Sequence, residues 1–94
     1  MTKIIEKRNK QDVQMHIDKA YEIIKDNLPV GYVEKVLSKL KADKTLNAGT
    51  VRNIKNRISK YPFSRLDVLN ALVEVANEYQ ASVQKLANNL KTDN

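Results

Sequence analysis

Cysteine is absent from this sequence, which excludes disulfide bonds, thiolate metal sites and a thiol nucleophile. Tryptophan is absent too, and there are only two glycines, two prolines and one phenylalanine, Phe63. This composition argues against a β-sandwich or a β-barrel, both of which need many turns and β-forming side chains. With 94 residues the chain can bury one modest core. We therefore predict a single all-α domain.

Long apolar runs are also missing. No stretch approaches the roughly 18 consecutive apolar residues that a membrane span requires. Residues 1–10 carry two isoleucines among charged side chains, rather than the apolar core of a signal peptide. We expect a cytoplasmic protein with no export signal and no membrane partner.

The usual sequence signatures of catalysis are not found. The sequence has no glycine-rich phosphate loop, no G-x-S-x-G motif and no H-E-x-x-H motif. His16, the only histidine, lies next to an apolar stripe, where a boundary residue is a more common role than a ligand or a base. We expect no enzyme, no cofactor, no metal site and no small-molecule substrate.

Positive charge is concentrated in the middle of the chain. Residues 35–65 contain nine basic residues and one acid, Asp43, which gives a net charge of +8. The remainder contains eight basic and ten acidic residues, a net charge of −2. A surplus confined to one segment is typical of a surface that binds a polyanion, with a solvated lysine-rich surface as the alternative. We assign phosphate binding to Lys39, Lys41, Lys44, Lys55, Arg57 and Lys60.

Apolar spacing predicts the first two helices. Steps of three and four indicate a helix over residues 11–27, which ends before Pro29. A second helix of about ten residues begins near Gly31 or Tyr32. Residues 1–10 show no such period, and we interpret them as a flexible basic arm. The second apolar stripe consists of Val33, Val36, Leu37 and Leu40.

A third helix is predicted over residues 48–58, with Asn47 as its N-cap. The residues expected to face its core are Val51, Ile54 and Ile58. The outward side chains are then Gly49, Thr50, Arg52, Asn53, Lys55, Asn56 and Arg57. Small residues let a helix approach DNA bases, while arginine and asparagine can make bidentate contacts to guanine and adenine. The alternative is an amphipathic helix whose polar face is only solvated.

A long fourth helix is predicted after Ser64 and Asp67, which form a start signal of the capping-box kind. Its apolar residues alternate steps of three and four, as in the a and d positions of a heptad repeat. They are Leu69, Leu72, Ala76, Tyr79, Val83, Leu86 and Leu90. Two interpretations remain open for this stripe. It is either a seam against the first helix of the same chain or a dimer contact through its last four members, Tyr79, Val83, Leu86 and Leu90.

Three segments carry a resemblance to a known family. They are L-P-V-G-Y-V at 28–33, G-T-V-R-N-I at 49–54 and L-D-V-L-N-A-L-V-E-V-A at 66–76. These segments resemble the small helix-turn-helix proteins of bacterial mobile elements and prophages, related to the phage repressor and Cro fold. The resemblance covers roughly residues 28–80 and implies a central helix-turn-helix. Together with the helix pattern it leads us to predict a four-helix DNA-binding domain over residues 11–80 with a long C-terminal helix. Residues 81–94 would extend the last helix, as a possible dimer contact.

By this resemblance Thr50, Arg52 and Asn53 lie where base-reading residues are found, with Gly49 and Lys55 beside them. Dimers of such proteins place two recognition helices about 34 Å apart, one turn of B-DNA. The expected function is that of a small cytoplasmic transcriptional regulator that binds double-stranded DNA and performs no chemistry.

Two other functions fit the same residues. One is a helical protein-interaction module, or dimeric adaptor, whose heptad stripe binds while the lysines only solubilise. The other is an RNA-binding helical domain, which would share the basic surface. Against the latter, the four tyrosines and Phe63 do not interleave with the basic residues as a base-stacking platform would.

Overall fold

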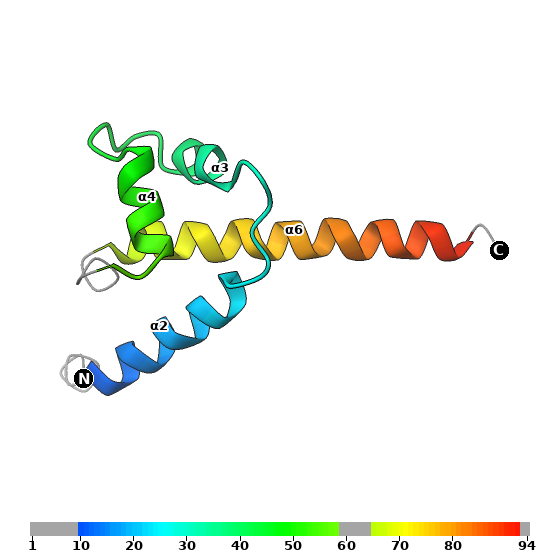
Figure 1. Ribbon diagram of the computed structural model, residues 1–94, viewed down its shortest axis with the longest axis horizontal. Coiled ribbons are helices and arrows are strands. Elements are labelled where there is room, and N and C mark those ends of the chain that lie inside the picture. The colour runs from blue at the N-terminus through cyan, green and yellow to red at the C-terminus, as the bar shows by residue number, and fades with distance from the viewer. Residues whose placement is uncertain (1–9, 59–64, 93–94) are drawn as a thin grey trace, which may run out of the picture.

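The computed structural model describes residues 10–58 and 65–92, which form four helices and no strand (Figure 1). The helices are α2 (Lys10–Ile24), α3 (Tyr32–Lys39), α4 (Ala48–Lys55) and α6 (Leu66–Thr92). The predicted all-α, four-helix architecture with a long last helix is therefore confirmed. The predicted basic arm before Lys10, the phosphate contact Lys60 and the start signal Ser64 lie outside the described residues.

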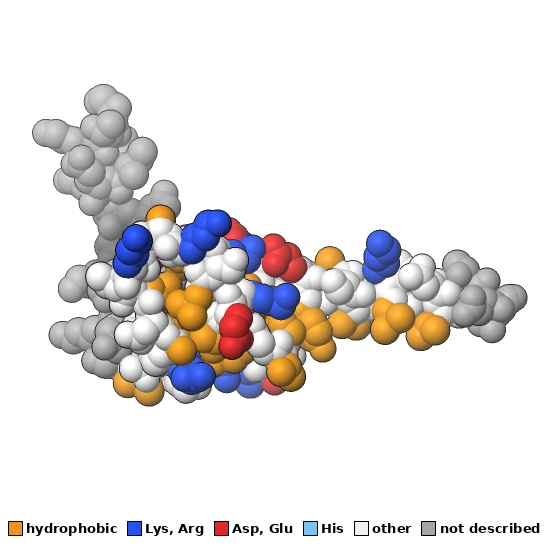
Figure 2. Space-filling view, turned by 90° about the horizontal axis from the view of Figure 1, so that it is seen from above, with side chains coloured by type: hydrophobic (Ala, Val, Ile, Leu, Met, Phe, Trp, Pro, Cys, Tyr) orange, Lys and Arg blue, Asp and Glu red, His pale blue; other side chains and the backbone are white. Residues whose placement is uncertain are grey.

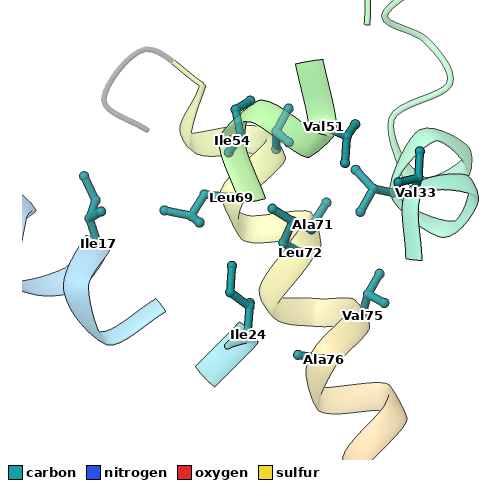
Figure 3. Packing of buried hydrophobic residues seen from close by; sticks show 12 residues of the cluster. Ile17, Ile24, Val33, Val51, Ile54, Leu69, Ala71, Leu72, Val75 and Ala76 are labelled. Atoms are coloured by element: carbon teal, nitrogen blue, oxygen red, sulfur yellow. The ribbon is translucent and has the colours of Figure 1, made fainter. Parts of the chain in front are cut away.

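The long helix α6 is the axis of the fold. Helix α2 lies on one side of it, and α3 and α4 lie on the other, with α4 over the first turns of α6 (Figure 1). Side chains from all four helices meet along the first half of α6 (Figure 3). The buried core consists of Ile17, Ile24, Val33, Val36, Val51, Ile54, Val68, Leu69, Ala71, Leu72, Val75 and Ala76. The apolar stripes predicted for the first two helices thus face this core.

The second half of α6 extends away from the other helices (Figure 1). Every side chain from residue 77 to residue 91 is exposed. We call residues 79–92 the stalk, and we call the described residues 10–58 and 65–78 the body. In the part of the chain that the structure describes, no helix has both the length and the apolar content of a membrane span.

The turn between α2 and α3 is built by local hydrogen bonds. Helix α2 ends at Ile24 rather than at residue 27, and the Asn27 side-chain amide donates to the Ile23 carbonyl at 2.6 Å. The Tyr32 N–H donates to the Pro29 carbonyl at 3.2 Å. Gly31 precedes α3 with φ of 84°, a left-handed conformation that glycine adopts without steric cost. Proline and glycine therefore separate the two helices, as their positions in the sequence predict.

Helix α4 begins as predicted and ends earlier than predicted. The Asn47 side-chain oxygen accepts the Thr50 N–H at 2.9 Å, which confirms the N-cap. At the other end Arg57 adopts φ of 59°, its N–H donates to the Ile54 carbonyl at 3.0 Å, and the Ile58 N–H donates to the Asn53 carbonyl at 2.9 Å. This pattern is a Schellman motif, which terminates a helix.

The prediction that Ile58 faces the core is wrong. Its side chain is 47% exposed. The left-handed residue Arg57 turns the chain out of the helical path, so Ile58 no longer lies on the stripe formed by Val51 and Ile54. A helical period can be extrapolated only as far as the helix itself continues.

Candidate nucleic-acid interface

Helix α4 is held against the body by its buried face and by its C-terminal end. Val51 and Ile54 are both completely buried in the core. The Tyr21 hydroxyl of α2 donates a hydrogen bond to the Ile54 carbonyl. Since that carbonyl belongs to the last turn of α4, the bond joins α2 directly to the end of α4. Burial raises the pKa of Tyr21 above its ordinary value, so the phenol stays protonated and can donate this bond.

Arg57 makes a second link between α2 and the end of α4. Its guanidinium lies 4.9 Å from the centre of the Tyr21 ring, within the range of a cation–π contact. The same guanidinium pairs with the Asp18 carboxylate. Hydrogen bonds from Arg57 and then from Gln14 lower the pKa of Asp18. Arg57, predicted to bind phosphate, is thus paired with an acid of α2 at the surface of the body.

The outward face of α4 is polar and free of acidic residues. Gly49 and Arg52 are exposed, and Asn53 and Lys55 are half-buried. The helix sequence A-G-T-V-R-N-I-K contains two basic side chains and no carboxylate. Neither Arg52 nor Lys55 has an ion-pair partner among the described residues. A helix with this face presents a net positive surface to solvent.

The first turn of α4 is shaped by its cap. The Thr50 hydroxyl donates to the Asn47 side-chain oxygen at 3.2 Å, so this predicted base-reading residue also takes part in the cap. A Cβ atom at Gly49 would lie 3.3 Å from the same Asn47 oxygen. This distance is tight, so a larger side chain at position 49 would push against the cap. The turn therefore keeps its smallest residue on the outward side.

Lys39, another predicted phosphate contact, is tied to α6. Its Nζ atom lies 2.9 Å from Glu78 Oε2 and 3.5 Å from Glu74 Oε1. The hydrogen bond to Glu78, followed by that to Glu74, raises the pKa of Lys39. This arrangement connects the end of α3 to α6 and leaves the ammonium group already partnered.

Arg65 joins the loop between α3 and α4 to the start of α6. Its Nη2 atom lies 2.7 Å from Asp43 Oδ2 and 3.1 Å from Asp67 Oδ2. Hydrogen bonds from Thr45 and then from Arg65 lower the pKa of Asp43, and Arg65 lowers the pKa of Asp67. The sequence placed Arg65 among the basic residues of 35–65 and did not predict this link. The available signal was Asp43, the single acid of the basic segment.

The basic segment therefore divides into two groups. Three framework cations, Lys39, Arg57 and Arg65, form ion pairs within the body. Five other cations of the segment have no ion-pair partner in the described ranges. Lys35 lies on α3, and we call the remaining four the available cations. They are Lys41, Lys44, Arg52 and Lys55. The first two precede α4 in the chain and the last two lie on it, so they belong to one short stretch around this helix.

The predicted dimer contact lies entirely on the stalk. The exposed fractions of its four side chains are 40% for Tyr79, 48% for Val83, 57% for Leu86 and 59% for Leu90. The first three members of the same stripe, Leu69, Leu72 and Ala76, are buried in the body. A seam within the chain thus accounts for the first half of the stripe, and no described residue covers the second half.

Comparison with known proteins supports no family assignment. The chain matches no family model, no curated protein and no solved structure. The resemblance to helix-turn-helix proteins stays a prediction based on the three sequence segments.

Proposed function

We propose that this protein binds double-stranded DNA, with α4 in the major groove, and acts as a small transcriptional regulator by occupying its site. The observation that carries the proposal is the outward face of α4, which is basic, contains no acid and is anchored by Asn47, Tyr21 and Arg57. A rigid helix of this kind can enter the major groove, which is wide enough to admit it.

The residues of α4 divide naturally between base reading and phosphate contact. Arg52 and Asn53 carry the two side chains that best recognise guanine and adenine edges, and Gly49 allows close approach at the first turn. Lys41, Lys44 and Lys55 flank them and neutralise phosphates. Phosphate contacts position the helix, whereas only the base contacts carry sequence preference.

The framework ion pairs favour the same function. A polyanion is repelled by carboxylates near its binding surface, and Asp18 and Asp43 both belong to segments next to α4. Arg57 neutralises the first and Arg65 the second. The available cations are therefore not opposed by an unpaired acid at these two positions.

The proposal is tested by the salt dependence of binding to a fluorescent duplex. With the three phosphate contacts Lys41, Lys44 and Lys55, log K should fall against log salt with a slope of about −2.7, because each contact releases about 0.9 of a counterion. Fluorescence anisotropy at several salt concentrations measures this slope. An affinity that does not change with salt would contradict the proposal.

Matched double variants separate α4 from general positive charge. Arg52→Ala with Lys55→Ala removes two charges from α4, whereas Lys85→Ala with Lys91→Ala removes two from the stalk. We expect the first pair to reduce affinity for duplex DNA at least tenfold and the second to change it by less than about threefold, since only contacting charges release counterions. Equal effects of the two pairs would mean that binding is not centred on α4.

Two rivals are distinguished by simple competition and sizing. Single-stranded RNA that displaces duplex DNA at equal concentration would favour the RNA-binding alternative. The protein-interaction alternative is supported by the exposed stripe of the stalk, and it predicts an oligomer that ignores DNA. Light scattering with and without a random duplex distinguishes that outcome from DNA binding.

A further inference from the structure

The apolar stripe of α6 has one covered half and one open half. In the body, α2 packs over it, and Ile17 and Ile24 point toward α6 beside Leu69 and Leu72 (Figure 3). The stripe then continues past the end of α2 onto the stalk. Asn27, in the turn after α2, lines a hollow together with Tyr79 and Val83. The stalk therefore begins where the cover given by α2 stops.

The positions beside the open stripe are suited to contact with another helix. In the heptad pattern the flanking residues of the stalk are Gln80, Ser82, Ala87 and Asn89, none of which is charged. The two basic residues, Lys85 and Lys91, occupy outer positions of the heptad. Figure 2 shows apolar side chains gathered along one edge of the stalk and a basic side chain on the opposite edge. Two copies of this face can meet without like-charge repulsion.

We propose that the stalk pairs with the stalk of a second copy of this chain in antiparallel orientation. A two-fold axis midway between Val83 and Leu86 places Val83 opposite Leu86 of the second copy. It also places Tyr79 opposite Leu90 of the second copy. All four exposed members of the stripe are then matched in one register, and none is left over.

A parallel pair is excluded by the position of α2. In a parallel pair the a and d positions of both helices face each other along their length. In the body these positions are covered by α2 of the same chain, and each α2 is about 10 Å thick. Two straight α6 helices held apart by two such layers could touch only near their tips. The antiparallel pair avoids this clash because the two bodies lie at opposite ends.

Contact between the two stalks alone is smaller than a typical dimer interface. The stalk is about 20 Å long and a helix is about 10 Å wide, so this contact covers on the order of 200 Å² per copy. Stable dimers bury about 800 Å² per partner. The difference has to come from contact between the stalk tip and the other body. Two hollows flank Tyr79 at the base of the stalk, one lined by Pro29 and Val75 and the other by Asn27, and the antiparallel tip reaches this base.

The oligomeric state is measured by sedimentation equilibrium across a wide concentration range. We expect a monomer–dimer equilibrium for the unchanged chain. Leu86→Glu should weaken dimerisation at least tenfold, because it puts two carboxylates beside the two-fold axis. The control Ala81→Glu adds the same charge on the opposite face of the stalk and should leave dimerisation unchanged. Both residues are exposed, so circular dichroism should show a folded body in each variant.

The orientation is tested with cysteine variants, since the chain has no cysteine of its own. An equimolar mixture of Tyr79→Cys and Leu90→Cys should form a mixed disulfide under mild oxidation. Leu90→Cys alone should not, because the two Leu90 positions are separated along the antiparallel axis by about 16 Å. A disulfide needs Cα atoms within about 7 Å.

Three results would overturn the inference: a monomer at all concentrations, a larger oligomer, or efficient cross-linking of Leu90→Cys alone. The stalk carries none of the available cations, so stalk pairing and DNA binding can fail independently of each other.

Discussion

The two halves of α6 carry the same heptad stripe, but only the first half of the stripe is buried. Leu72 and Ala76 in the body are completely buried, whereas Leu86 and Leu90 on the stalk are more than half exposed. Their spacing and side-chain types alone would not distinguish them. The difference is that α2 arrives over the first half and ends before the second. A heptad period therefore specifies a face that can be buried, and the rest of the fold decides whether it is.

The largest contrast is expected in the stability of the folded monomer. Leu72→Ala should lower the free energy of unfolding by about 2–5 kcal/mol, because it opens a cavity in the core. Leu86→Ala should change it by less than about 0.5 kcal/mol at low protein concentration, where the stalk is unpaired. Urea denaturation followed by circular dichroism measures both. If Leu86→Ala costs as much as Leu72→Ala, the stalk is packed against the body in solution.

A second contrast separates base reading from phosphate binding within the body. Arg52→Ala should cost about 1–3 kcal/mol in binding free energy at one base position and little elsewhere, because it removes a contact to a base edge. Lys44→Ala should weaken all sequences alike and reduce the salt slope by about 1. Binding-site selection from random duplexes, followed by titration of single-base variants, measures the two effects. Identical behaviour of both variants would show that α4 does not read bases.

Glycine should have opposite effects in the body and on the stalk. Arg57 is left-handed, which costs a non-glycine residue about 1 kcal/mol, so Arg57→Gly should be more stable than Arg57→Ala by about that amount. Both variants lose the contacts with Asp18 and Tyr21, and the comparison isolates the backbone. On the stalk, Ala81→Gly should lower helix stability by about 1 kcal/mol. Thermal unfolding and helicity measurements check both, and equal stability of the two Arg57 variants would contradict the left-handed turn.

The smallest effects are expected on the melting temperature of the protein at low pH. The pKa values of Asp18 and Asp67 are lowered in the folded protein, by Arg57 and Arg65 respectively, so each carboxylate binds protons more weakly than in the unfolded chain. Their contribution to stability is fully present above the unfolded pKa of about 3.9 and is lost as pH falls through the lower, folded values. The melting temperature should therefore drop below about pH 4.

Asp18→Asn should reduce that acid dependence, and Asp26→Asn, at a position without an ion pair in the described structure, is the matched control. The apolar stripe of the stalk and its flanking positions carry no carboxylate, and Glu78 only lines a hollow at the base of the stalk, so dimerisation should change little until the body itself unfolds. A dimer that dissociates at a pH where the body remains folded would contradict the uncharged contact.

The parts of the fold that were predictable depend on short-range chemistry. Asn47 caps α4 through a bond to a residue three positions away, and Pro29 and Gly31 separate α2 from α3 by their own backbone preferences. The end of α4 was not predictable in this way. Arg57 occupies a conformation that glycine usually takes, and its partner Asp18 is 39 residues away in the chain.

The candidate site also has features that the sequence predicts and features that it does not. The basic segment and the outward face of α4, including Arg52 and Lys55, were predictable from the sequence. The sequence did not distinguish the cations that form ion pairs from those that do not. Lys39, Arg57 and Arg65 turned out to be paired with acids on α6, on α2 and in the loop before α4. No spacing rule links these partners, because each pair joins segments that come together only after folding.

The sequence by itself determined four helices, their apolar faces and the place where positive charge accumulates. Only the tertiary structure decided which cations remain available around α4 and which half of the α6 stripe stays open. Helix periods, caps and turns depend on neighbours within a few residues, so they can be read along the chain. Ion pairs and burial depend on which distant segment of the chain packs against a given surface. No described segment of the same chain packs against the apolar stripe of the stalk.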